Sequence, residues 1–193
     1  MDKLNIKDAE GAKHLIAQAV TAEGQQFLGR KAPDGKTLLG AALCTGNLIV
    51  AREMLTRGVD PNTGRLRGDD AKELPDQMPF ECALDLASVE MLLDAGLLET
   101  ARNKSGFGPL HVLVENNRLN ETELLLKRGF SPNLKQADNR IPLHTAAYYG
   151  NLAMIELLLK YGSDVSARDH AGSTPESWAR SQNKGDAVQL LRR

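Results

Sequence analysis

The sequence predicts an all-α solenoid of stacked helix-turn-helix units joined by hairpin-like loops. Two short phrases recur along the 193-residue chain at one step of 33 residues. The tripeptide Pro109-Leu110-His111 returns as Pro142-Leu143-His144, and the leucine run at 124–126 returns at 157–159. Two independent phrases that keep one period indicate repeated units that stack. Such a stack forms an extended surface, which favours binding over catalysis as the first hypothesis.

The unit from Ala137 to Ser166 shows how one repeat should fold. Pro142 suits the first turn of a helix, where its missing N–H costs nothing. Gly150 can end that helix in the left-handed conformation. The second helix carries apolar residues at helical spacing, Ile155, Leu158 and Leu159, and Gly162 ends it. Two short helices cannot bury both apolar faces alone, so each unit must pack on its neighbours.

These residues resemble the ankyrin repeat, whose units carry Thr-Pro-Leu-His, then Ala-Ala and Gly, then a leucine-rich helix that ends in Gly. Pro142-Leu143-His144 with Ala146-Ala147 and Gly150 follows that order closely. The resemblance covers roughly residues 33–193. It implies a non-enzymatic protein-binding module, without a cofactor, that uses its concave face and its hairpin tips.

The period divides the chain into a single domain of consecutive units. We expect an N-terminal helical cap (1–32), a repeat (33–64), an irregular acidic repeat with a long loop (65–100), two regular repeats (101–135 and 136–168) and a C-terminal capping repeat (169–193). Leu4, Ile6, Leu15 and neighbouring apolar residues could line the N-terminal cap. We expect the chain to be a monomer.

The irregular repeat breaks the period in two ways. From Leu38 to Pro79 is 41 residues, eight more than one step, which predicts a long loop at about 62–78. From Pro79 to Leu92 is 13 residues, against 16 from Pro109 to Leu125, which predicts a first helix shortened by three residues. Long loops inside a regular solenoid usually have a functional reason.

The helix-capping threonine of the family survives at only two places. Thr37 and Thr174 keep it, whereas Met78, Gly108 and Ile141 stand in its place elsewhere. Three caps are therefore predicted to be lost, each at a cost of about 0.5–2 kcal/mol.

Composition narrows the classes of function further. The formal net charge is −1, so charge does not favour nucleic acid or a membrane surface as a partner. The sequence has no apolar run long enough for a membrane span, and its N-terminus does not resemble a signal peptide. Cys44 and Cys82 lie in no paired motif, which favours free thiols in a reducing compartment. We therefore expect a cytoplasmic protein, or one delivered to a host cytosol.

Aromatic residues supply the first candidate binding site. Stacking should bring Tyr148, Tyr149 and Trp178 to neighbouring ridges of one face, where aromatic side chains make good hot spots. The alternative is that Trp178 packs under the C-terminal cap and that one tyrosine belongs to the core. The same face and its loops add four further candidates for partner binding: Glu115, Arg140, Thr145 and His170.

Charge supplies the second candidate. The segment from Asp69 to Glu99 contains nine acidic residues and a single base, Lys72. Its first four acids are the candidate binding residues: Asp69, Asp70, Glu73 and Asp76. A field of this sign would attract a basic partner, so an inhibitor or immunity-type protein that neutralises a basic enzyme or toxin is the alternative function. A simply solvated face is the blander explanation.

Two other classes of function remain as comparisons. An effector enzyme would need chemistry within the acidic insert, where carboxylates and no histidine are present. A structural spacer would have no tight partner. His111 and His144 stand at the signature position, where histidine bonds the neighbouring turn, and no spacing typical of a metal or catalytic site occurs. Asn62 and Asn133 are expected to stabilise turns. The sequence therefore predicts no catalytic and no metal-binding residues.

Overall fold

The computed structural model describes His14, residues 16–17, Leu28, residues 36–65 and residues 77–192. Most of the predicted N-terminal cap (1–32) therefore lies outside the described residues, as do Asp69, Asp70, Glu73 and Asp76. Contacts divide the chain into two compact units, residues 1–104 and 105–193. The predicted boundaries between individual repeats remain predictions.

The helical elements of the first unit whose bounds the structure gives are α2 (Leu38–Cys44), α3 (Leu48–Thr56), the 3₁₀ helix η2 (Pro79–Glu81) and α4 (Leu86–Asp94). Helix α2 packs against both α3 and η2. The second unit contains three helix pairs: α5 (Pro109–Glu115) with α6 (Leu119–Lys127), α7 (Pro142–Tyr149) with α8 (Leu152–Lys160), and α9 (Pro175–Ser181) with α10 (Gly185–Leu191).

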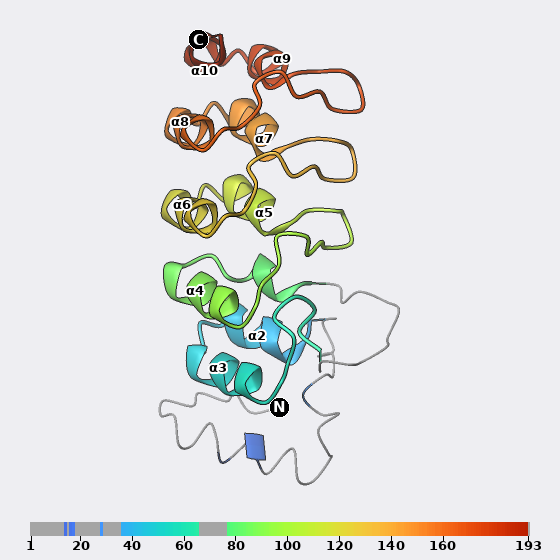
Figure 1. Ribbon diagram of the computed structural model, residues 1–193, viewed down its shortest axis with the longest axis vertical. Helices are drawn as coiled ribbons and strands as arrows, with labels where there is room; N and C mark the ends of the chain where they lie inside the picture. Colours follow the sequence, from blue (N-terminus) through green and yellow to red (C-terminus); the bar gives the residue numbers. More distant parts are fainter. Residues whose placement is uncertain (1–13, 15, 18–27, 29–35, 66–76, 193) are drawn as a thin grey trace. The chain divides into compact units, whose positions relative to one another are not determined.

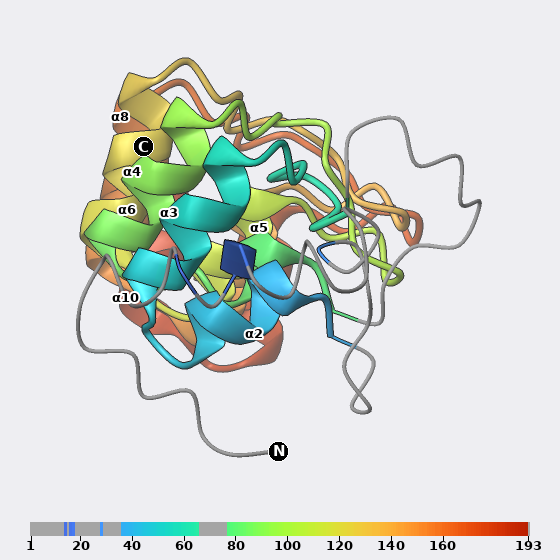
Figure 2. The same cartoon turned by 90° about the horizontal axis from the view of Figure 1, so that it is seen from below.

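The second unit is a two-layered stack. Helix α7 packs between α5 and α9, and α8 packs between α6 and α10 (Figure 1). Figure 2 looks along this stack, so that α6, α8 and α10 overlap on one side and the long connecting loops on the other. Within the described residues, β-structure is limited to isolated bridges such as that between Lys36 and Gln77. The predicted all-α solenoid is confirmed.

Apolar residues at helical spacing hold the pairs together. Leu143, Ala146 and Ala147 of α7 and Ile155 and Leu158 of α8 are all buried. The two alanines lack bulk, which lets α7 lie close to its neighbours. Each fully buried leucine or isoleucine contributes about 1.5–3 kcal/mol relative to an exposed one. As predicted, Gly150 ends α7 with a positive φ of 69°, a conformation that glycine adopts without a steric penalty.

Met78 and Ile141 make no side-chain cap hydrogen bond, as predicted, but another side chain binds the backbone N–H at each of these helix N-termini. Thr37 Oγ1 accepts a hydrogen bond from the Gly40 N–H at 3.1 Å, as expected of a cap. At Met78 and Ile141, which have no hydroxyl, the residue three positions later reaches back instead. Glu81 Oε2 accepts the Met78 N–H at 2.6 Å, and His144 Nδ1 accepts the Ile141 N–H at 3.2 Å. These side chains offset part of the predicted cost.

The irregular repeat has a shorter first helix than predicted. Where α5 has seven residues, η2 has three and is a single 3₁₀ turn. The described flanks of the long loop lie close to the start of α2. Gln77 bridges to Lys36 on one side, and on the other Gly64 lies so near Thr37 that a Cβ there would clash with its hydroxyl.

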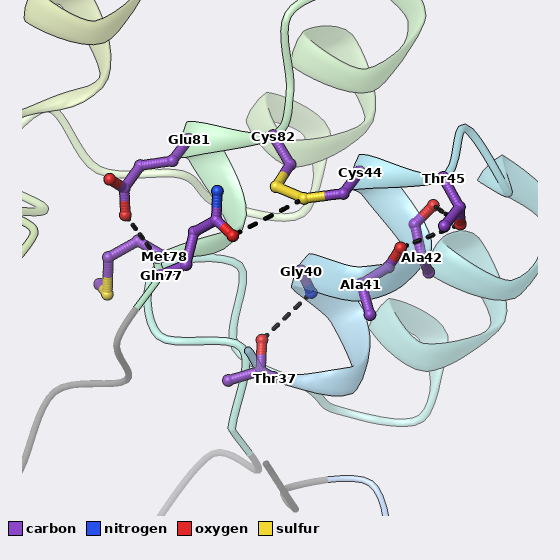
Figure 3. Close-up of a disulfide and its surroundings, with 10 residues drawn as sticks. All are labelled: Thr37, Gly40, Ala41, Ala42, Cys44, Thr45, Gln77, Met78, Glu81 and Cys82. Carbon is purple, nitrogen blue, oxygen red and sulfur yellow. Dashed lines mark hydrogen bonds between the residues drawn. A yellow bond between two sulfur atoms is a disulfide. The ribbon is translucent and has the colours of Figure 1, made fainter. Parts of the chain in front are cut away.

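The expectation of free thiols is wrong. Cys44 and Cys82 form a disulfide with a Cα–Cα distance of 4.7 Å (Figure 3). Cys44 is the last residue of α2, and Cys82 directly follows η2. Because the first helix of the irregular repeat is short, both cysteines stand at the ends of consecutive first helices. In the chain-entropy model, a cross-link that closes a loop of this length stabilises the fold by about 4 kcal/mol.

Histidines of the second unit tie each repeat to the next. His111 Nε2 lies 3.4 Å from the Arg140 carbonyl, and His144 Nε2 lies 3.1 Å from the Ser173 carbonyl, each 29 residues further on. Because His144 Nδ1 accepts the Ile141 N–H, its Nε2 carries the proton and donates. The predicted bonding to the neighbouring turn is confirmed.

Asparagines make a second set of such bridges. Asn133 Nδ2 donates to the Gly162 carbonyl at 2.9 Å, and its Oδ1 accepts the Asp164 N–H at 2.8 Å. In the first unit, Asn62 Oδ1 accepts the Leu98 N–H at 2.7 Å. The predicted role in stabilising turns is confirmed.

Within the described residues, none of the helices could span a bilayer.

His144 predicts a stability that depends on pH. Burial lowers its pKa from an ordinary value near 6.5, and the opposing influence of the Ser173 carbonyl and Asp169 does not restore it. As pH falls below about 6.5, the unfolded chain takes up this proton before the folded chain does, so stability is lost. Urea unfolding at several pH values from 7.5 to about 5 measures this. His144→Gln should reduce the slope, whereas exposed His170→Gln should keep it; equal slopes in all three proteins would contradict the assignment.

Asn133 predicts a local contribution to stability. Asn133→Ala removes both hydrogen bonds to the following turn and should cost about 1–2 kcal/mol of unfolding free energy. Asn120 lies exposed on α6, so Asn120→Ala is a control that should change the unfolding free energy by no more than about 0.5 kcal/mol in either direction. Urea unfolding of the two variants under the same conditions compares them. Equal stability of both variants would show that the bridge contributes nothing.

Candidate protein-binding site

Three aromatic side chains of the second unit, Tyr148, Tyr149 and Trp178, form what we call the aromatic cluster. The two tyrosines end α7, and Trp178 lies in the middle of the neighbouring α9. The ring of Tyr148 meets that of Tyr149 at 5.3 Å between centroids and that of Trp178 at 5.7 Å, edge to face in both pairs. Tyr148 is 38% exposed and Tyr149 53%, so neither belongs to the core.

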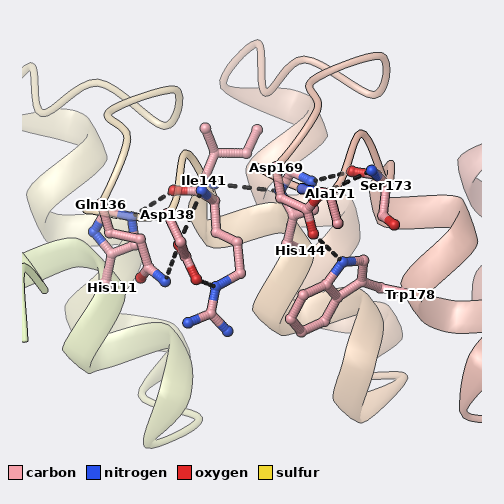
Figure 4. Close-up of polar contacts among 10 residues, drawn as sticks. His111, Gln136, Asp138, Ile141, His144, Asp169, Ala171, Ser173 and Trp178 are labelled. Carbon is pink, nitrogen blue, oxygen red and sulfur yellow. Dashed lines mark hydrogen bonds and ion pairs between the residues drawn. The ribbon is translucent and has the colours of Figure 1, made fainter.

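Trp178 is half-buried, between the two alternatives that the sequence left open. Its indole Nε1 donates to Asp169 Oδ2 at 2.9 Å (Figure 4). The His144 ring meets it edge-on at 6.0 Å, and the Arg140 guanidinium lies 5.1 Å from its ring centroid. A cation over an indole face contributes about 0.5–1 kcal/mol at exposed sites. These contacts fix the orientation of the indole while leaving part of it open to solvent.

Asp169 accepts three hydrogen bonds in and beside the loop before α9. Its Oδ1 accepts the backbone N–H groups of Ala171 and Ser173 at 2.9 and 2.8 Å, while Oδ2 holds the indole. Burial opposes ionisation, but the hydrogen bonds from Trp178, Ser173 and Ala171 together hold the pKa of Asp169 below its usual range. The carboxylate is therefore charged at neutral pH and positions Trp178.

The Arg140 side chain is likewise held by a carboxylate, that of Asp138, in the loop before α7. Its Nε lies 2.5 Å from Asp138 Oδ2, and Gln136 Nε2 donates to Asp138 Oδ1 at 2.8 Å. Burial opposes ionisation of Asp138, yet hydrogen bonds from Gln136 and Arg140 lower its pKa overall. A partly exposed ion pair adds little stability, so its main effect is to aim the guanidinium at Trp178.

The other predicted binding residues are placed less favourably or lie apart. Thr145 is only 8% exposed, so it offers little surface. Glu115 is exposed at the end of α5, at the position of its repeat that Tyr148 occupies in the next. His170 is exposed in the loop before α9, and its backbone N–H donates to the Asp138 carbonyl at 2.9 Å.

The supporting residues Asp138, His144 and Asp169 were not predicted as part of the site. The available signal was turn chemistry, because Asp138 lies within, and Asp169 opens, a turn that precedes a helix-starting Pro. Among the described residues, no group of three possible metal ligands occurs.

Two acids of the segment from Asp69 to Glu99 make local structural bonds. Glu81 Oε1 accepts from Asn103 Nδ2 at 2.8 Å, in addition to the bond that Glu81 makes with Met78. Asp85 Oδ1 accepts the Ser88 N–H at 3.0 Å and caps α4. These carboxylates stabilise helix N-termini, so their presence in the segment has an explanation that does not require a basic partner.

Comparison with known proteins agrees with the geometry. The family model for ankyrin repeats in three copies matches residues 110–193. Among curated proteins, no significant match to the chain is found. Ankyrin repeats generally serve as protein–protein interaction modules and are typically not enzymes. The matched repeats and the stacked helix pairs together show that residues 110–193 are ankyrin repeats.

Proposed function

We propose that this ankyrin-repeat protein is a non-enzymatic binding module that holds a protein partner on the aromatic cluster and the loops before α7 and α9. The single observation that supports this proposal most is the arrangement of Trp178. Its indole is anchored by Asp169 and covered on one face by Arg140, yet it stays half-exposed beside two exposed tyrosines.

This arrangement favours tight association for two physical reasons. Tyrosine and tryptophan bury a large area, about 150–250 Å² each, with few rotatable bonds. Furthermore, the indole already has a fixed orientation, so binding does not have to immobilise it at a further cost in entropy. A rigid aromatic anchor with exposed rings around it is the usual composition of a binding hot spot.

The inhibitor alternative depends on the acidic segment. Asp69, Asp70, Glu73 and Asp76 lie outside the described residues, and Glu81 and Asp85 already have structural partners. Only the sequence therefore supports the inhibitor alternative. The aromatic cluster is the stronger basis for a proposed function.

The proposal predicts the effect of removing the exposed rings. A partner captured from a native lysate and identified by mass spectrometry should bind the double variant Tyr148→Ala/Tyr149→Ala at least about tenfold more weakly, measured by calorimetry. Tyr161 lies at the end of α8, in the other helix layer, so Tyr161→Ala is the matched control and should bind normally. Normal affinity of the double variant would refute the role of the cluster.

Asp169 offers a second, independent test. Asp169→Ala removes the acceptor of the indole N–H, so the side chain of Trp178 should become more solvated and less fixed. The fluorescence of Trp178, the sole tryptophan, should then shift to longer wavelength, while the circular dichroism of the helices is retained. Partner affinity should fall about threefold or more, since an immobilised anchor is lost. A shifted emission with unchanged affinity would show that a fixed indole is not needed for binding.

A further inference from the structure

We propose that Cys44 and Cys82 form a site of reversible thiol–disulfide exchange that fastens η2 to α2 in the first unit. The two residues are 4.7 Å apart at Cα, inside the range that a disulfide bridges without movement of the backbone. This inference is independent of the partner-binding proposal, because it concerns the first unit alone.

The cross-link lies where one of the two neighbouring first helices is a single short turn. In the second unit, α5, α7 and α9 offer seven or eight residues each to their neighbours. In the first unit, η2 offers three residues to α2. Met78 and Phe80 at this turn are buried, so opening of the turn would expose apolar surface. A covalent bond to α2 compensates for the missing helical contact.

The surroundings of the two sulfur atoms favour exchange over permanent closure. Cys44 is exposed and Cys82 is half-buried, so a small disulfide or thiol reaches Cys44 first. Gln77 Oε1 lies 3.9 Å from Cys44 Sγ (Figure 3). In the reduced state, this amide oxygen can accept a hydrogen bond from the Cys44 thiol, so both states of the site have a partner for that sulfur.

The chemistry balances with glutathione as the exchange partner. The Cys44 thiolate attacks one sulfur of glutathione disulfide, the bond between the two glutathione sulfurs breaks, and one glutathione thiolate leaves. The Cys82 thiolate then attacks the Cys44 sulfur of this mixed disulfide and releases the second glutathione. Two electrons pass from the protein dithiol to glutathione disulfide, and the two cysteine protons are taken up by the released thiolates or the solvent.

A reversible pair, unlike a permanent one, is compatible with a reducing compartment. In a reducing compartment, disulfides are usually transient and serve in catalysis or in redox sensing. The pair would be open at a reducing glutathione ratio and closed at an oxidising one. The disulfide of the first unit would then form or open according to the ratio of reduced to oxidised glutathione.

Hydrogen exchange of the protein tests whether the disulfide holds η2 on α2. After equilibration with glutathione disulfide, thiol titration should find no free cysteine, and amides of residues 78–84 should exchange at least about tenfold more slowly than after reduction with dithiothreitol. Amides of α7 in the second unit should exchange at the same rate in both states. Two titratable thiols after oxidation, or equal exchange of residues 78–84 in both states, would overturn the proposal.

Single substitutions test the order of attack. In glutathione disulfide, Cys82→Ser should accumulate one glutathione on Cys44, detected by mass spectrometry, because the resolving thiol is missing. Cys44→Ser should react much more slowly, and the double variant Cys44→Ser/Cys82→Ser should show the exchange pattern of the reduced protein under both conditions. Equal rates of modification for the two single variants would contradict the assignment of Cys44 as the reactive residue.

Discussion

The hydrogen bond from His144 Nε2 to the Ser173 carbonyl is the contact on which the candidate site depends. It joins α7 to the loop before α9, and that loop contains Asp169. Asp169 in turn accepts the indole N–H of Trp178 and two backbone N–H groups. One buried histidine, kept neutral by the burial that lowers its pKa, thus sets the geometry of an exposed surface nearby. The same residue also replaces the missing cap at Ile141, so fold and site share one side chain.

The sequence alone predicts the scaffold because the scaffold is periodic. The 33-residue step places Pro142, Gly150 and the buried leucines correctly, and the register alone brings the aromatic cluster together. The exposure of Trp178 could not be predicted in this way. It depends on Asp169, nine residues earlier, and on Arg140 in the preceding repeat, and both lie in loops whose shape the helical period does not determine.

The cysteine pair shows a different limit. A separation of 38 residues matches no repeat step, so the pair gave no signal as long as the period was assumed to hold. The break in the period is what brings the two residues together, because the shortened first helix ends directly before Cys82, while α2 ends at Cys44. Among the repeats that the structure describes, the irregular one therefore combines the shortest first helix with the covalent link. Asp69, Asp70, Glu73 and Asp76 of this repeat lie outside the described residues, so their role in binding remains a prediction from the sequence.

Trp178 is the only tryptophan of the chain, so its fluorescence reports on the candidate site without labelling. The most direct test of the account is a titration of the protein with its captured partner, followed at once by tryptophan emission and by calorimetry, with a partner preparation or fragment that contains no tryptophan. If the aromatic cluster is the binding site, the emission of Trp178 will change and saturate with the same dissociation constant that calorimetry gives. Binding by calorimetry with no change in Trp178 emission would place the interface elsewhere and contradict the account.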